Sequence, residues 1–126
     1  MNDELKEPVK IGMPKSHNLK LDAMLENADS IFSEKKDIYR LAISVAIKEK
    51  KIGDKNTKYD WLSYTVEQID PEPKYFYNIV RSSYPDEEEA VYTTVQRLAT
   101  AGIEILYDNF EKNGGNILLS HYLEGK

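Results

Sequence analysis

The feature that most constrains the fold of this chain is a nearly continuous apolar run within residues 33–53. Between Ile38 and Ile47, only Arg40 and Ser44 are polar. A helix that is apolar around most of its circumference is normally packed against neighbours on several sides. The polar positions that remain lie three or four residues apart, so they predict one narrow row facing solvent. This row consists of Arg40, Ser44, Lys48 and Lys51.

The two ends of the run predict where this central helix begins and ends. Ser33 is suited to the N-cap, and Gly53 follows a group of lysines and is suited to the C-terminal stop. Around the central helix, apolar spacing predicts the other elements. They are a strand at 9–13, a possible β segment at 61–69, and helices at about 18–28, 74–83, 86–112 and 117–123.

Two of these helices carry further local signals. Asp86, with Glu89 three residues later, resembles a capping box that would open the 86–112 helix. Within that helix, a patch of small residues would let another helix approach closely; it contains Ala99, Ala101 and Gly102. In the 74–83 helix, spacing predicts a common side for Phe76, Ile79, Val80 and Ser83.

The expected fold class is mainly α, with four to five helices around the buried central helix and a short N-terminal β-strand. A length of 126 residues fits a single domain, with a strand–helix–helix half at 9–53 and an acidic helical half at 54–126. Residues 1–60 hold twelve Lys or Arg and eleven Asp or Glu, whereas residues 61–126 hold five and eleven. The net charge of −5 therefore argues against general affinity for nucleic acid but leaves room for a local basic face in the first half.

The location predicted from the sequence is the cytoplasm. The chain has no cysteine, which fits a reducing compartment and leaves no disulfide framework. Its first residues are charged, and no apolar run approaches the length of a membrane span. We therefore expect neither a signal peptide nor contact with a membrane.

Candidate catalytic and metal-binding patterns are weak. His17 and His121 are far apart, and neither has a second His or a Cys at ligand spacing. Ser44 lies in the middle of a helix without a nearby base, and the acidic run at 86–89 suits a helix N-terminus. We therefore expect no catalytic residue, no metal site, no cofactor and no enzymatic activity.

The most promising candidate site is a set of basic residues beside the 9–13 strand, in the first half of the chain. Two such strands paired in a homodimer would form a ribbon that fits the DNA major groove. The N-terminus of the central helix would then meet a phosphate through its free N–H groups. The alternative is that the strand only pairs and the lysines are solvated. The candidate nucleic-acid-binding residues are Lys10, Lys15, His17, Lys35 and Lys36.

These segments also carry a family resemblance. The order of VKIGMPKS, HNLKLDAMLENA and DIYRLAISVAI resembles ribbon–helix–helix DNA-binding proteins. More narrowly, SIFSEKKDIYRLAISVAIKEKKIGD resembles small accessory proteins of the Dnd system, the bacterial DNA phosphorothioation and restriction machinery, and VQRLATAGIEILYDNF is similar to a later helix of those proteins. The resemblance implies a non-enzymatic component of an anti-phage defence locus that acts on or near DNA.

The resulting expectation is a DNA-binding accessory protein of a DNA-modification and restriction system. It would form a homodimer or higher oligomer through strand pairing and the small-residue patch. The alternative is an adaptor that docks other proteins of that machinery through its acidic C-terminal half, at Glu87, Glu88 and Glu89. A third possibility is an acidic mimic that occupies the DNA site of another protein.

Overall fold

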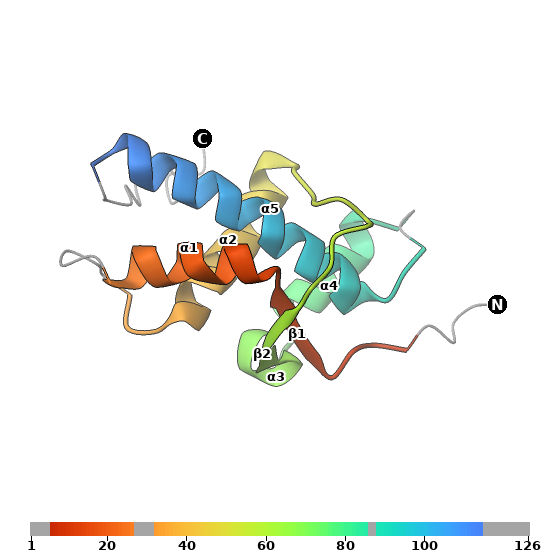
Figure 1. Ribbon diagram of the computed structural model, residues 1–126. Coiled ribbons are helices and arrows are strands. Elements are labelled where there is room, and N and C mark those ends of the chain that lie inside the picture. Colours follow the sequence, from red (N-terminus) through yellow and green to blue (C-terminus); the bar gives the residue numbers. More distant parts are fainter. Residues whose placement is uncertain (1–5, 27–31, 86–87, 115–126) are drawn as a thin grey trace.

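The computed structural model describes residues 6–26, 32–85 and 88–114, and its fold is mainly helical with one two-stranded sheet (Figure 1). In chain order the elements are β1 (Lys10–Met13), α1 (Lys15–Glu26), α2 (Lys35–Glu49), β2 (Trp61–Thr65), α3 (Val66–Ile69), α4 (Tyr75–Ser83) and α5 (Val91–Lys112). The predicted fold class is therefore confirmed, while the predicted 117–123 helix lies outside the described residues. Among the described helices, none combines the length and apolarity needed to cross a membrane.

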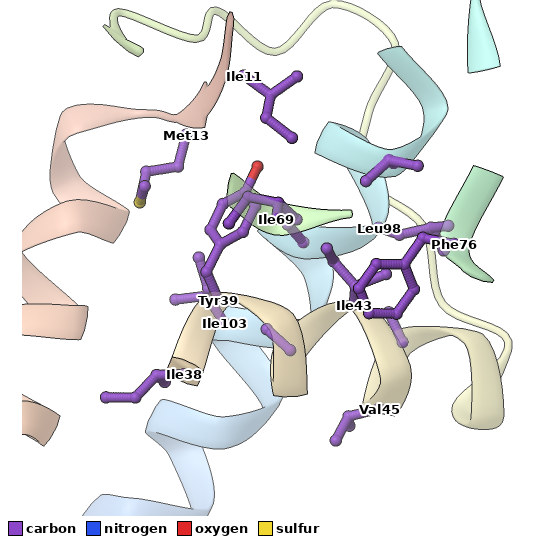
Figure 2. Close-up of a cluster of buried hydrophobic side chains, with 14 of the residues drawn as sticks. Ile11, Met13, Ile38, Tyr39, Ile43, Val45, Ile69, Phe76, Leu98 and Ile103 are labelled. Carbon is purple, nitrogen blue, oxygen red and sulfur yellow. The ribbon is translucent and has the colours of Figure 1, made fainter. Parts of the chain in front are cut away.

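Helices α2 and α5 pack directly against each other at the centre of the core. The contact depends on Gly102, because a Cβ atom placed there would overlap the carbonyl oxygen of Ala42. The predicted small-residue patch does admit a second helix, and that helix is α2 of the same chain. Figure 2 shows Tyr39 and Ile43 of α2 in one apolar cluster with Leu98 of α5.

Helix α2 matches the predicted central helix in its faces but not in its ends. The predicted polar row is exposed, and six other residues of the helix are buried. Glu34 is the N-cap in place of Ser33, and it makes no side-chain capping bond. The helix ends at Glu49, and Lys50 is its C-cap: with a positive φ of 59°, Lys50 donates its N–H to the carbonyl of Ile47. Because the last carbonyls are satisfied there, the helix stops before Gly53.

Strand β1 pairs with β2 of the same chain, and the two strands lie side by side in Figure 1. They are antiparallel, with Lys10 opposite Thr65 and Ile11 opposite Tyr64. The possible β segment at 61–69 is thus confirmed for its first five residues. The remaining residues form α3 instead, because Thr65 and Gln68 make a capping box that starts a helix.

The other edge of β1 is covered by two helices. The N–H of Gly12 donates to Oε1 of Gln96 on α5 at 3.0 Å, and its carbonyl accepts from the hydroxyl of Tyr39 on α2 at 2.6 Å. Ile11 and Met13 are fully buried. The prediction that β1 pairs with its counterpart in a second copy is therefore wrong for this fold. The strand and the small-residue patch suggested a homodimer, but both make their contacts within one chain.

Helix α5 begins at Val91, later than predicted. The N–H groups of Val91 and Tyr92 donate to the carboxylate of Glu7 at 2.9 and 2.8 Å. A carboxylate is favoured at a helix N-terminus, so this distant side chain caps α5. Glu89 precedes the helix and Asp86 lies outside the described residues, so the predicted capping box does not open α5.

Replacing Gly102 by Ala is expected to lower the free energy of unfolding by about 3 kcal/mol, because the new methyl group would overlap the backbone of α2. Urea unfolding followed by circular dichroism measures this change. The control Ala101→Ser adds a similar volume to the neighbouring half-buried position and is expected to cost less than about 1 kcal/mol. Wild-type stability of the Gly102→Ala variant would contradict the close packing of α2 and α5.

Candidate functional site

The residues predicted to contact DNA do not form one basic face. Lys10 and Lys15 are exposed, at the starts of β1 and α1. The backbone N–H of Lys15 donates to Oδ1 of Asp60 at 2.8 Å, so a carboxylate lies beside this lysine. The other three candidates, all on α1 and α2, each contact an acidic side chain of the same chain.

His17 is buried and joins α1 to α5. Its Nε2 lies 2.8 Å from Oε2 of Glu104, and its Nδ1 lies 3.3 Å from Oγ of Ser16. A Ser–His–carboxylate chain is also the arrangement of many hydrolases, where the serine faces a substrate cleft. Here Ser16 and His17 are consecutive, and neither lines the cavity beside Glu104, which has a volume of about 580 Å³. The contact therefore holds two helices together, and His17 does not face a DNA groove.

Lys35 and Lys36 are both paired at the start of α2. Nζ of Lys35 lies 2.9 Å from Oδ1 of Asp22 and donates to Oδ1 of Asn18 at 3.0 Å. Nζ of Lys36 lies 3.7 Å from Glu34. A phosphate at this helix N-terminus would meet two carboxylates, so the surroundings do not favour the predicted phosphate contact.

The sheet does present a small outward face. Lys10 lies opposite Thr65, whereas Trp61 lies opposite buried Met13, and a register shift between these two pairs interrupts the regular alternation of side chains along β2. Ser63 and Lys10 are exposed, and Trp61 keeps 38% of its surface exposed. Sequence reasoning named Lys10 but missed Trp61, because alternation alone does not say which face of a strand is covered. We call this surface the outer ribbon face.

The acidic residues predicted to dock a partner also divide into different roles. Glu87 lies outside the described residues, and Glu88 is exposed. Glu89 accepts hydrogen bonds from Nη1 of Arg97 and from Oγ1 of Thr94, each at 2.7 Å. The side chains of Glu89 and Arg97 are 17% and 7% exposed. Glu89 therefore anchors the chain before α5 and is not available to a partner.

Glu89→Ala is expected to lower the free energy of unfolding by about 3 kcal/mol, because buried Arg97 would lose its carboxylate. Glu88→Ala, at the exposed neighbouring position, is the matched control and is expected to change it by less than about 0.5 kcal/mol. Chemical unfolding of the three proteins in parallel measures the difference. Equal stability of both variants would show that Glu89 is a surface residue after all.

A different surface has the character of a binding site, and the buried carboxylate of Asp70 positions it. Asp70 is 3% exposed and accepts from the N–H groups of Phe76 and Tyr77 at 3.0 and 2.9 Å. The hydroxyl of Tyr92 on α5 donates to the same carboxylate at 2.7 Å. Asp70 thereby satisfies the first turn of α4 and ties it to α5.

Fixed in this way, α4 lies beside α2 and leaves a groove of about 350 Å³ between them. We call it the α2–α4 groove; its lining includes Arg40, Ser44, Pro71, Pro73, Phe76 and Ile79. Phe76 points into the core cluster, as Figure 2 shows. Tyr75 and Ile79, one turn apart on α4, are 67% and 41% exposed. Phe76 and Ile79 both line the groove, so the predicted common side of this helix carries exposed Ile79 as well as buried Phe76 and Val80.

The remaining buried polar groups are suited to structure and not to acid–base chemistry. Burial raises the pKa of Tyr59 and of Tyr64 to about 12, and it raises the pKa of fully buried Tyr39 well above its ordinary value. Burial, followed by the hydrogen bond to Asp70, also raises the pKa of Tyr92. These hydroxyls stay protonated near neutral pH. In the described part of the chain, no group of three or more His, Asp or Glu side chains could hold a metal ion.

Comparison of the chain with protein-family models, with curated proteins and with solved structures found no match in any of the three. The resemblance to Dnd-system proteins therefore stays a prediction from the sequence.

Proposed function

We propose that this protein is a non-enzymatic adaptor that holds a segment of a partner protein in its α2–α4 groove. The observation that supports this most directly is the pair Tyr75 and Ile79, both exposed on one side of α4 beside the groove. Single exposed apolar residues are ordinary, but adjacent ones beside a concave surface are typical of an interaction site. Arg40 completes the groove, and Tyr and Arg are residue types enriched at the energetic centres of interfaces.

The machinery in which the adaptor acts is proposed from the sequence resemblance alone. Two separated segments resemble Dnd-system accessory proteins in the expected order, which suggests a role in DNA modification and restriction. Neighbouring genes test this part: a chromosomal locus without modification or restriction genes would remove it. The groove would still be a docking site in that case, since its geometry does not depend on the family.

DNA binding is a second candidate function, and the outer ribbon face favours it. A two-stranded ribbon fits the major groove, and this ribbon carries an exposed cation, Lys10, and a partly exposed aromatic ring, Trp61. If this face binds DNA, a gel shift at low salt is abolished by Lys10→Glu with Lys15→Glu and is kept in Lys112→Glu. The same shift in all three proteins, or none at micromolar concentration, would contradict it.

The adaptor proposal predicts that Tyr75→Ala with Ile79→Ala lowers partner binding at least about tenfold, because both side chains would be buried in the complex. Quantitative affinity purification from cells that express the protein naturally measures partner recovery. Leu19→Ala is the matched control, since Leu19 is also an exposed apolar residue, 59% exposed, but lies on α1. Equal recovery with the double variant and the wild type would contradict docking at the groove, provided that circular dichroism shows both to be folded.

A further inference from the structure

We propose that residues 7–9 form a releasable strap that controls the order of α4. While Glu7 holds the start of α5, Tyr92 and Asp70 hold the first turn of α4; release of Glu7 lets α4 open locally while the core stays folded. This switch is a property of the free protein and goes beyond the proposed adaptor function. It would also act on that function, because residues of α4 line the α2–α4 groove.

The strap borders a cavity of about 440 Å³. Its three residues, Glu7, Pro8 and Val9, line this cavity together with residues of β2, α3, α4 and α5. Val9 is 78% exposed, and Glu7 and Pro8 are only partly buried. Besides the bonds of Glu7 to α5, the carbonyl of Val9 accepts from the N–H of Val66 at 3.0 Å. A segment that borders a cavity and buries little apolar surface can leave its place while the core remains packed.

A continuous series of hydrogen bonds runs from the strap to α4. The carboxylate of Glu7 accepts from the N–H groups of the first two residues of α5 at 2.9 and 2.8 Å. The second of these residues is Tyr92, whose hydroxyl donates to Oδ2 of Asp70 at 2.7 Å. Asp70 in turn accepts from the N–H groups of Phe76 and Tyr77 at 3.0 and 2.9 Å. Each bond positions the group that makes the next one, so loss of the first weakens the last.

Helix α4 depends on this series because it is short and mostly exposed. It has nine residues and buries only Phe76 and Val80, whereas isolated helices below roughly 12 residues are marginal in water. The N–H groups of Phe76 and Tyr77 belong to the first turn, where a helix offers no carbonyl partner, so Asp70 satisfies them. Regions that bury little apolar surface open with the smallest change in free energy. Weakening the hold on Asp70 therefore opens α4 before α2, which buries six residues.

Amide hydrogen exchange followed by NMR tests this switch on the full-length protein with no partner present. The N–H groups of Phe76 and Tyr77 report on α4, and the N–H of buried Ile43 in the middle of α2 reports on unfolding of the core. If α4 opens locally, its two amides exchange faster than Ile43 in every variant. Exchange of all three amides at one rate would overturn the switch, because α4 would then open only when the whole fold unfolds.

Three variants locate the control in the strap. Glu7→Ala is expected to accelerate exchange of the two α4 amides at least about fivefold, the effect of losing a helix cap, and Lys6→Ala at the exposed neighbouring position less than about twofold. Tyr92→Phe removes only the hydroxyl that reaches Asp70 and is expected to accelerate the same amides. Adding Glu7→Ala to Tyr92→Phe should then change their exchange less than about twofold, because the series is already broken. Wild-type exchange of α4 in Glu7→Ala, or a full additional effect of Glu7→Ala in the Tyr92→Phe protein, would overturn the switch and leave the adaptor function untouched.

Discussion

The contact between Gly102 of α5 and Ala42 of α2 is the constraint on which the rest of the structure depends. Without a side chain at position 102, the two helix backbones meet, and α5 can also contact α1, α4 and β1. Each of the smaller elements is therefore placed relative to one helix pair. The α2–α4 groove is a consequence, because its two walls are held by α5 independently of each other.

Local patterns in the sequence predicted the elements that depend on local physics. The apolar run of α2 and its polar row were predictable, because burial on several sides requires that composition whatever the neighbours are. The small-residue patch around Gly102 also indicated a close helix contact. The identity of the neighbour was not predictable: the same patch fits a second copy of the chain as well as α2. For the same reason, the strand at 9–13 was recognisable, while its pairing with Trp61–Thr65 was not.

The candidate sites were harder to predict, because the role of a charged residue depends on partners far along the chain. Glu7 caps α5 from 84 residues away, and His17 meets Glu104 across 87 residues. Glu89 looked like an exposed acid in the sequence, yet it holds Arg97. The spacing that places Ile79 on the same side of α4 as Phe76 did not show that Ile79 would remain exposed. Several residues that suggested DNA contact or partner docking, among them His17 and Glu89, thus hold the fold together.

The most direct test of this account is a nuclear Overhauser effect between an Hα of Gly102 and the Hα of Ala42. The close approach of the two backbones predicts a strong cross-peak, and a mixture of labelled and unlabelled protein should show that it arises within one chain. Absence of the cross-peak in folded protein would contradict the packing of α2 on α5. A cross-peak that arises only between labelled and unlabelled chains would instead place α2 against the α5 helix of a second copy.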